Sequence, residues 1–328
     1  LMDRDIEYKD FLNTDIKIHY LVRKHKLDVS IFNKLYKVCK YFKPNIIHSW
    51  ASLFTLYAIP YAKLNNTKLI DGSIRYGVPI KFLSKTSIIS KINFLFVDKI
   101  VTNSYAGLKA HQLVENNKQL CIYNGFNFTR LDNLTAQNAI RKQHNINTDY
   151  IIGMVARFSN SKDYNLYVKV AMKILNKRSD ITFLCVGKGE NKAKIESMVP
   201  ENMRGKILFI GNINNVEEVI NIFDISILVS NTNGHAEGIS NSIMESMALT
   251  KPIIATFAGG NKELIIDNET GFLINPFDSI NFEEKIIFLL NNEEIRLKMG
   301  KLGRERISNK FSSKIMVDKY IDLYKGLC

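Results

Sequence analysis

Short apolar runs alternate with longer amphipathic stretches along most of the chain. In the first part of the chain, the apolar runs predict strands at 44–50, 67–73, 97–104 and 119–126. Between them, apolar residues three and four apart predict helices at 51–64, at 81–96 and from residue 105 onward. Such alternation is typical of a parallel sheet with helices on both faces.

The alternation restarts after a polar, irregular stretch at 127–149, which is rich in Asn, Thr and Gln. Here the apolar runs predict strands at 150–157, 181–187, 206–211, 225–230, 252–256 and 271–276. The remaining stretches predict helices at 163–177, 190–198, 214–223, 240–248, 261–266, 279–290, 293–308 and 312–326. The predicted fold class is therefore α/β, with two Rossmann-like, doubly wound parallel-sheet domains facing each other across a cleft.

We place the domain boundary in the irregular stretch, so that the domains are 1–135 and 136–311. The last helix, within 312–328, is expected to cross back to the first domain. Only four strands are found in the first domain, so we expect that domain to be incomplete at its start.

Composition narrows the class of protein. The chain of 328 residues is 46% hydrophobic and 23% charged, which is typical of a folded protein without long disordered segments. No apolar run approaches the roughly 20 residues that span a bilayer, and "LMDRDIEYKD" lacks the apolar core of a signal peptide. The four cysteines are scattered, which favours free thiols in a reducing cytoplasm over disulfides or a zinc site.

The positive charge is concentrated in the first domain. Residues 1–135 hold 20 Lys and Arg against 10 Asp and Glu, and the whole chain carries a net charge of +13. Between Asp71 and Asp98 there are four basic residues among apolar ones and no acid. This pattern favours a surface for phosphate groups, such as lipid headgroups, and equally a solvated helix face. Nucleic-acid binding has only the charge in its favour, because no basic motif with interleaved aromatics occurs.

The chain contains no Walker A motif and no GxGxxG fingerprint. The segment "VGKGEN" at 186–191 follows a predicted strand but lacks the third glycine. We interpret it as a tight turn.

Charged side chains gather after two predicted strands of the second domain. Arg157 and Lys162 follow the strand at 150–157, and two cations there can hold a diphosphate. After the strand at 225–230, the loop "NTNGHAEG" leads into a helix that begins near Ser240. The free amides of the first turn of that helix form a ready site for an anion.

Two carboxylates bracket the start of this helix. Glu237 lies in the loop and Glu245 lies about one turn inside the helix, so they reach different parts of a bound molecule. A carboxylate beside an anion site is suited to accept hydrogen bonds from hydroxyl groups, which sugars supply. We predict one carboxylate for a sugar, one for a ribose, and a diphosphate between them.

The sequence resembles glycosyltransferase family 4, a family of retaining enzymes with the GT-B fold. The resemblance runs from about Pro44 to the C-terminus and is carried by "MVARFSNSKDY", "FIGNINNVEEVINIFDISILVS", "HAEGISNSIMESMALTKPIIATFAGGNKELI" and "TGFLI". It implies that Arg157 and Lys162 hold the donor diphosphate and stabilise the charge that develops on it. It implies also that Glu237 acts at the donor sugar, as the third catalytic residue.

The same resemblance implies the rest of the donor site. Gly238, Ile239 and Ser240 would offer backbone amides to sugar and phosphate, and Glu245 would bind the ribose. The "AGG" turn with Gly259 and Gly260 is either a sugar contact or a plain backbone turn. Glu245 can also be explained as an acid that the helix dipole favours, and the two cations as surface charges.

The first domain departs from the family pattern. No Gly-rich loop precedes 3–15, and the His that many members carry after the strand at 67–73 is absent. Ser73, or else Asp71 or Arg75, occupies that place, and His48 one strand earlier is either structural or on the acceptor side. We expect these four residues on the acceptor side and leave open whether the chain is active.

The resemblance implies a retaining glycosyltransferase that needs no metal or other cofactor. The donor would be UDP- or GDP-linked, and the acceptor a glycan or a lipid-linked glycan of a bacterial surface polysaccharide. The expected localisation is cytoplasmic, with the basic, apolar segment 75–96 against an anionic membrane. Two alternatives stay open: a nucleotide-sugar 2-epimerase of the same fold, and an inactive nucleotide-sugar-binding protein.

Overall fold

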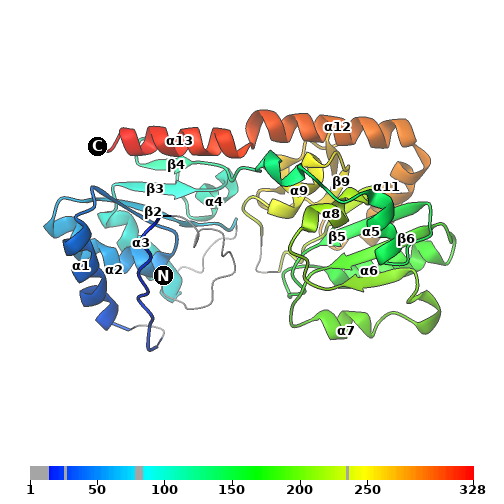
Figure 1. Cartoon of the computed structure of the whole chain (residues 1–328), viewed down its shortest axis with the longest axis horizontal. Coiled ribbons are helices and arrows are strands. Elements are labelled where there is room, and N and C mark those ends of the chain that lie inside the picture. The colour runs from blue at the N-terminus through cyan, green and yellow to red at the C-terminus, as the bar shows by residue number, and fades with distance from the viewer. Residues whose placement is uncertain (1–14, 26–27, 78–83, 234–235) are drawn as a thin grey trace.

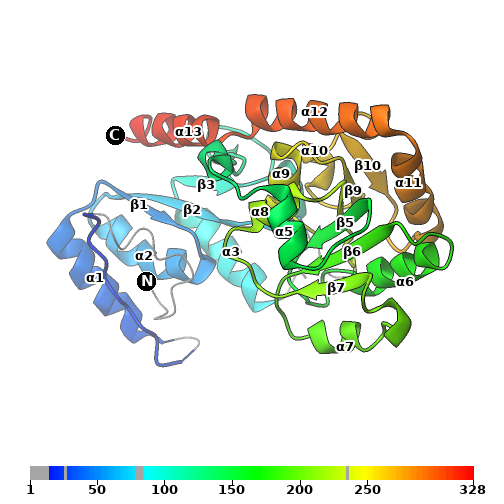
Figure 2. The same ribbon diagram turned by 45° about the vertical axis from the view of Figure 1, so that its right-hand side comes forward.

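The structure is a computed structural model that describes residues 15–25, 28–77, 84–233 and 236–328. Two lobes lie side by side, and the helices α12 and α13 run along one side of both (Figures 1 and 2). Each lobe is built around one parallel sheet, as predicted.

The first lobe holds a sheet with the strand order β1-β2-β3-β4 among the described residues. Its strands are β1 (Ile46–Ser49), β2 (Lys68–Ile74), β3 (Lys99–Thr102) and β4 (Gln119–Cys121). Its helices are α1 (Ser30–Phe42), α2 (Ser52–Leu64), α3 (Lys85–Phe96) and α4 (Tyr105–Ala110). The four predicted strands are thus confirmed. β1, β3 and β4 are shorter than their predicted runs, and β2 is shifted by one residue.

The second lobe holds a six-stranded sheet with the order β10-β9-β8-β5-β6-β7. Its strands are β5 (Tyr150–Val155), β6 (Ile181–Val186), β7 (Ile207–Ile210), β8 (Ile225–Leu228), β9 (Ile253–Thr256) and β10 (Gly271–Ile274). Its helices are α6 (Tyr164–Leu175), α7 (Lys192–Glu196), α8 (Val216–Asn221), α9 (Asn241–Ala248), α10 (Asn261–Leu264) and α11 (Ser279–Asn291). The direction in which the chain adds strands reverses between β5 and β8, which makes this pair the topological switch point of the sheet.

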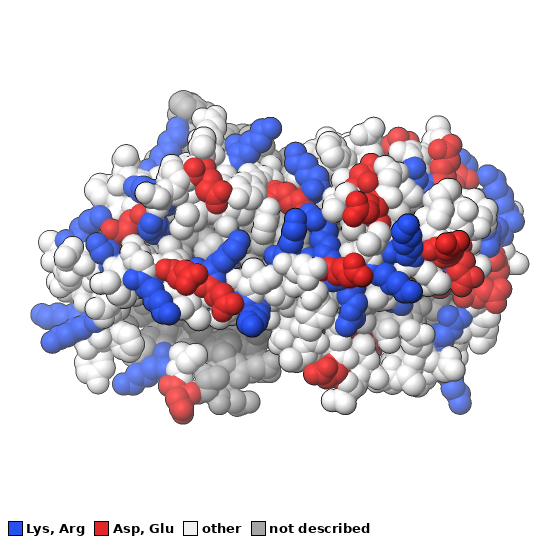
Figure 3. Space-filling view, turned by 90° about the horizontal axis from the view of Figure 1, so that it is seen from above, with Lys and Arg blue, Asp and Glu red and all other residues white. Residues whose placement is uncertain are grey.

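The last two helices connect the lobes. α12 (Glu293–Lys310) lies on the second lobe and α13 (Ser313–Lys325) lies on the first sheet, on the face opposite α1 to α3 (Figure 1). Buried Leu323 of α13 packs against Ile70 and Val101 of that sheet. At the crossing, the amide of Phe126 donates to the carbonyl of Phe311 at 2.7 Å. On the face that α12 and α13 cover, basic and acidic side chains are interspersed, so the excess positive charge does not gather there (Figure 3).

The structure corrects the prediction for the stretch at 127–149. This stretch contains a 3-10 turn, η2 (Phe128–Leu131), and a helix, α5 (Gln137–Gln143), rather than only irregular structure. α5 has a single buried residue, Ile140, so its sequence carries almost no apolar periodicity. Helix α1 was also not predicted, although its buried residues are regularly spaced at Ile31, Leu35 and Cys39.

Two predictions fall partly outside the described residues. The helix predicted at 81–96 begins at Lys85 in the structure, and residues 81–83 are not described. The segment 3–15, before which the family pattern has a Gly-rich loop, is described only at residue 15.

Candidate functional site

The predicted cations lie at the switch point of the second sheet. Arg157 and Lys162 are in the loop that follows β5, next to the loop that follows β8. The amide of Asp163 donates to the carbonyl of Val229 at 3.0 Å, and that of Asn231 donates to Ser161 at 3.0 Å. These bonds hold the two loops together at the carboxyl edge of the sheet, where parallel sheets bind ligands.

Lys162 and Glu237 form an ion pair between these loops. Only 13% of the Lys162 side chain and 16% of the Glu237 side chain are exposed. The structure therefore brings together two of the three predicted catalytic residues in direct contact.

Arg157 is placed by the loop that follows β6. Gly187 and Gly189 have φ angles of 141° and 153°, and a Cβ on them would lie 2.1 Å from the Ala156 carbonyl oxygen and 2.3 Å from that of Phe158. These glycines let "VGKG" pack directly against the Arg157 loop, which accounts for the tight turn predicted there. The Arg157 side chain is 74% exposed and its Nη2 lies 3.6 Å from Glu190 Oε2.

The loop "EGIS" leads into α9 as the sequence predicted. Ser240 is the N-cap residue and is buried, and α9 begins at Asn241. The side chain of Ile239 is buried in the core, so this residue can offer only its backbone to a ligand. The first-turn amides of α9 have no partners within the helix and can bind an anion at the switch point.

The "AGG" turn packs closely against the backbone of the "EGIS" loop. The amide of Gly260 donates to the carbonyl of Glu237 at 2.9 Å. A Cβ on Gly259, whose φ is 52°, would lie 2.1 Å from the same oxygen, and one on Gly260 would lie 1.9 Å from the Gly238 carbonyl oxygen. Both positions therefore require glycine, and the turn holds Glu237 in place through its main chain.

Glu245 is buried inside α9 and shares a cation with a second acid. Arg130 Nη2 lies 3.2 Å from Glu245 Oε1 and also forms an ion pair with Glu217. Burial raises the pKa of the Glu245 carboxyl, while Arg130 acts in the opposite direction. Sequence reasoning missed Arg130 and Glu217, because Arg130 is 115 positions from Glu245 and has no motif around it.

The loop from Ala236 to Ser240, called the donor loop after the role that the sequence predicts for it, touches the first lobe at the segment after β2. The amide of Gly77 donates to the carbonyl of Ala236 at 3.1 Å, and Tyr76 and Glu237 form an isolated β-bridge. A Cβ on Gly238 would lie 2.3 Å from the carbonyl oxygen of Arg75. Of the four residues predicted on the acceptor side, Arg75 is thus in direct contact with the donor loop.

The other predicted acceptor-side residues have partners within the first lobe. The buried carboxylate of Asp71 accepts from the amide of Ser73 at 3.0 Å and from Asn93 Nδ2 at 3.3 Å. His48 Nδ1 lies 2.8 Å from the Tyr324 hydroxyl of α13. Burial, and to a lesser extent Arg75, lowers the pKa of His48 to about 4, so its ring is neutral near pH 7.

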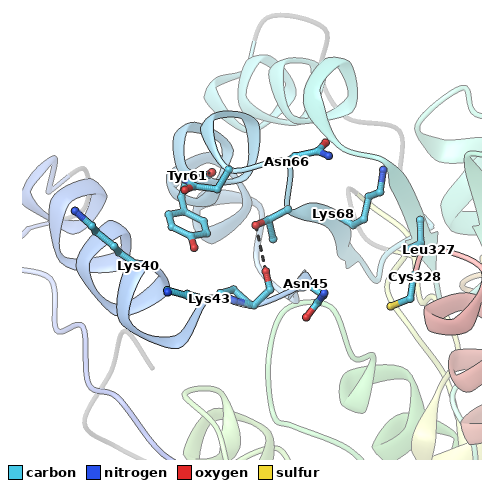
Figure 4. Close-up of a pocket in the computed structure, with 11 residues that line it drawn as sticks. Lys40, Lys43, Asn45, Tyr61, Asn66, Lys68, Leu327 and Cys328 are labelled. Atoms are coloured by element: carbon cyan, nitrogen blue, oxygen red, sulfur yellow. Dashed lines mark hydrogen bonds between the residues drawn. The ribbon is translucent and has the colours of Figure 1, made fainter.

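A cavity of about 600 Å³ lies elsewhere, at the amino ends of β1 and β2 (Figure 4). Lys40, Lys43 and Lys68 line it together with the end of α13. The carboxyl ends of α1 and α2 also point here, and their partial negative charge offsets these lysines. This cavity is therefore a poor anion site and lies at the wrong edge of the sheet for the predicted chemistry.

Two features are absent from the described residues. Within them, no three His, Cys, Asp or Glu side chains gather closely enough to hold a metal ion. In the same part of the chain, no helix is both long and apolar enough to cross a membrane.

Comparisons with known proteins identify the family and the fold of the chain. The sequence profile of the family described as glycosyl transferases group 1 matches residues 136–306. N-acetyl-alpha-D-glucosaminyl L-malate synthase of Bacillus anthracis is 24% identical over 290 residues, 88% of this chain and 71% of that protein. The capsular polysaccharide biosynthesis glycosyltransferase CapM of Staphylococcus aureus is 29% identical over 208 residues, 61% of this chain, and the chain spans 52% of its length.

A crystal structure of Anabaena Alr3699/HepE in complex with UDP has the same fold. It superimposes with a TM-score of 0.80 at 16% identity, over 94% of this chain and 86% of that one. The predicted two-sheet architecture is thereby confirmed. The chain therefore has the GT-B fold and belongs to the glycosyl transferases group 1 family of glycosyltransferases.

Proposed function

We propose that the chain is a retaining glycosyltransferase that transfers a sugar from a nucleotide-diphosphate donor to a glycan or a lipid-linked glycan. One observation carries this proposal: the loops after β5 and β8 bring Lys162, Glu237 and the start of α9 to one edge of the sheet. A cation and a set of free amides suit a diphosphate, and the neighbouring carboxylate suits sugar hydroxyl groups.

In the proposed mechanism the diphosphate lies at the start of α9, within reach of Lys162 and of the exposed Arg157. The leaving diphosphate gains negative charge as the glycosidic bond breaks, and these fixed positive groups stabilise that charge. Glu237 orients the donor sugar through its hydroxyl groups, and its backbone is held by the "AGG" turn. Retention of configuration, proposed from the family resemblance, requires the acceptor to attack from the face that the diphosphate leaves.

Glu245 takes the ribose hydroxyl groups in this proposal. Its burial and its contact with Arg130 fix the carboxylate in one position. Among nucleotides we favour UDP over GDP, because the structurally similar Alr3699/HepE was crystallised with UDP. The name of CapM supports a place in bacterial surface polysaccharide synthesis.

Helix α3 supports peripheral contact of the first lobe with an anionic membrane. Its buried side is polar and includes Ser87 and Asn93, while its exposed side is apolar, with Leu95 76% exposed. The rest of this apolar side consists of Ile88, Ile92 and Phe96, and Lys85 and Lys91 lie on the same helix. A helix whose exposed side is apolar and also carries basic residues is suited to contact with a layer of acidic lipid headgroups.

Incubation with UDP- and GDP-sugars, with and without lipid-linked glycan, tests the proposal. We expect release of nucleoside diphosphate to accelerate with acceptor, the product to retain the anomeric configuration, and Lys162→Met to lower turnover by about 100-fold. An epimer formed from donor alone would show an epimerase instead. Nucleotide binding without turnover for any acceptor would show a binding protein.

A further inference from the structure

An aromatic cluster lies at the carboxyl edge of the first sheet, next to the donor loop. Trp50 directly follows β1 and is 49% exposed. Its ring centroid lies 4.1 Å from that of His48 and 5.7 Å from that of Tyr320 of α13, which meets it edge-on at 68°. Helix α13 thus fixes the orientation of a half-exposed tryptophan at the edge where this sheet can bind a ligand.

The guanidinium of Arg75 lies over this tryptophan, 5.3 Å from the ring centroid. The main chain of Arg75 packs on Gly238, so this residue contacts both Trp50 and the loop of the proposed sugar site. The ion pairs found among the described residues do not include Arg75. Trp50, His48 and Tyr320 carry no negative charge near pH 7, so the aromatic cluster itself supplies no counter-charge for the guanidinium.

We propose that Trp50 and Arg75 form a subsite for an acceptor sugar that carries a carboxylate or a phosphate group. The inference rests on the proposed function and names the class of acceptor for it. The carbon-bound hydrogens on one face of a pyranose pack well on an aromatic ring, and an arginine fork binds either anion through two hydrogen bonds. Tyr320 is a positioning residue, since it reaches the sugar only through Trp50.

The arrangement discriminates between charged and neutral sugars. A neutral sugar on Trp50 would cover the guanidinium of Arg75 without giving it a counter-charge, which is unfavourable for a cation removed from water. A sugar with an anionic group supplies that charge at the place where Arg75 already lies. The subsite therefore selects its ligand by charge as well as by the flat face of the ring.

Trp50 is the single tryptophan of the chain, so fluorescence excited at wavelengths that the 14 tyrosines do not absorb reports on this subsite alone. The probes are methyl glucuronide, glucose 6-phosphate, methyl glucoside and inorganic phosphate. We expect the two charged sugars to change the Trp50 emission at concentrations at least tenfold lower than methyl glucoside. The midpoint is the sugar concentration at which half of the change in emission has occurred. A lower midpoint for methyl glucuronide shows a preference for carboxylate, and a lower one for glucose 6-phosphate shows a preference for phosphate.

Arg75→Met should raise the midpoints of the charged sugars to that of methyl glucoside and leave the latter unchanged. Arg204→Met, on the second lobe where Arg204 pairs with Glu201, serves as the matched control and should change nothing. Equal midpoints for charged and neutral sugars in the unmodified protein would overturn the proposal, as would an Arg75→Met protein that still discriminates. A response to inorganic phosphate as strong as that to glucose 6-phosphate would overturn the role of the sugar ring.

Thermal shifts with UDP and UDP-sugars on the same samples separate this inference from the proposed function. Stabilisation by nucleotides without any Trp50 response to sugars overturns the subsite alone. If neither UDP nor any UDP-sugar raises the melting temperature of the unmodified protein, the proposed function is overturned, and the acceptor assignment depends on that function.

Discussion

Lys162 and Glu237 are 75 positions apart in the sequence and form an ion pair at the switch point of the second sheet. Each comes from a different loop, and both side chains are largely buried. The lysine is thus paired with the carboxylate that we assign to the donor sugar.

The two carboxylates should affect nucleotides differently. Glu237→Ala should weaken the binding of nucleotide sugars by about 10- to 100-fold, the range that loss of charged hydrogen bonds implies. It should leave bare UDP unchanged or tighter, because Lys162 is released for the diphosphate. Glu245→Ala should weaken the binding of UDP and of nucleotide sugars alike, since both ligands contain the ribose. Calorimetric titration of each variant with UDP and UDP-sugars gives the comparison, and equal losses for the two variants would contradict the division of roles.

The "AGG" turn should tolerate no side chain. Gly260→Ala would place a Cβ 1.9 Å from the Gly238 carbonyl oxygen, so the loop that carries Glu237 has to move. We expect a loss of about 1–3 kcal/mol in the free energy of unfolding and weaker binding of nucleotide sugars. Gly211→Ala is the control, because nothing lies within 4 Å of a Cβ there. Thermal denaturation measures both variants, and similar midpoints would argue against the close packing of this turn.

His48 should make the stability of the protein depend on pH in a defined window. Its pKa is lowered from 6.5 to about 4 in the fold, chiefly by burial. His48 therefore binds a proton near pH 6.5 in the unfolded chain but only near pH 4 in the folded chain. The stability that the neutral ring contributes is present above pH 6.5 and is lost as the pH falls toward 4. Denaturation midpoints should fall more steeply over this range in the unmodified protein than in His48→Gln, and parallel curves would refute the assignment.

The exposed apolar side of α3 should bind anionic vesicles. Replacing Lys81, Lys85 and Lys91 by Glu should lower binding to phosphatidylglycerol vesicles by about 100-fold or more, since each basic residue near such a surface contributes about 1 kcal/mol. Lys81 lies outside the described residues. Replacing the exposed Lys298, Lys301 and Lys310 of α12 by Glu changes the net charge equally and should have little effect. Co-sedimentation distinguishes the two, and equal losses would mean that net charge alone drives binding.

Much of the fold could be predicted because its elements are long enough to show a period. The strands β5, β6 and β8 are mostly apolar along their whole length, since helices cover both of their faces. α5 escaped prediction because one buried residue leaves no period to detect. Register and strand order were also beyond the sequence, because they depend on which runs pair.

By itself the sequence determined the α/β class and the residues that carry charge at strand ends, because short-range periodicity and turn chemistry are local properties. Only the tertiary structure decided which distant residues are in contact. These contacts are Lys162 with Glu237, Arg130 with Glu245, and Arg75 with Trp50 and Gly238. The physical reason is that side chains interact over a few ångströms of space, whatever their separation along the chain. The folding of two sheets and one crossing helix brings these distant positions within that range.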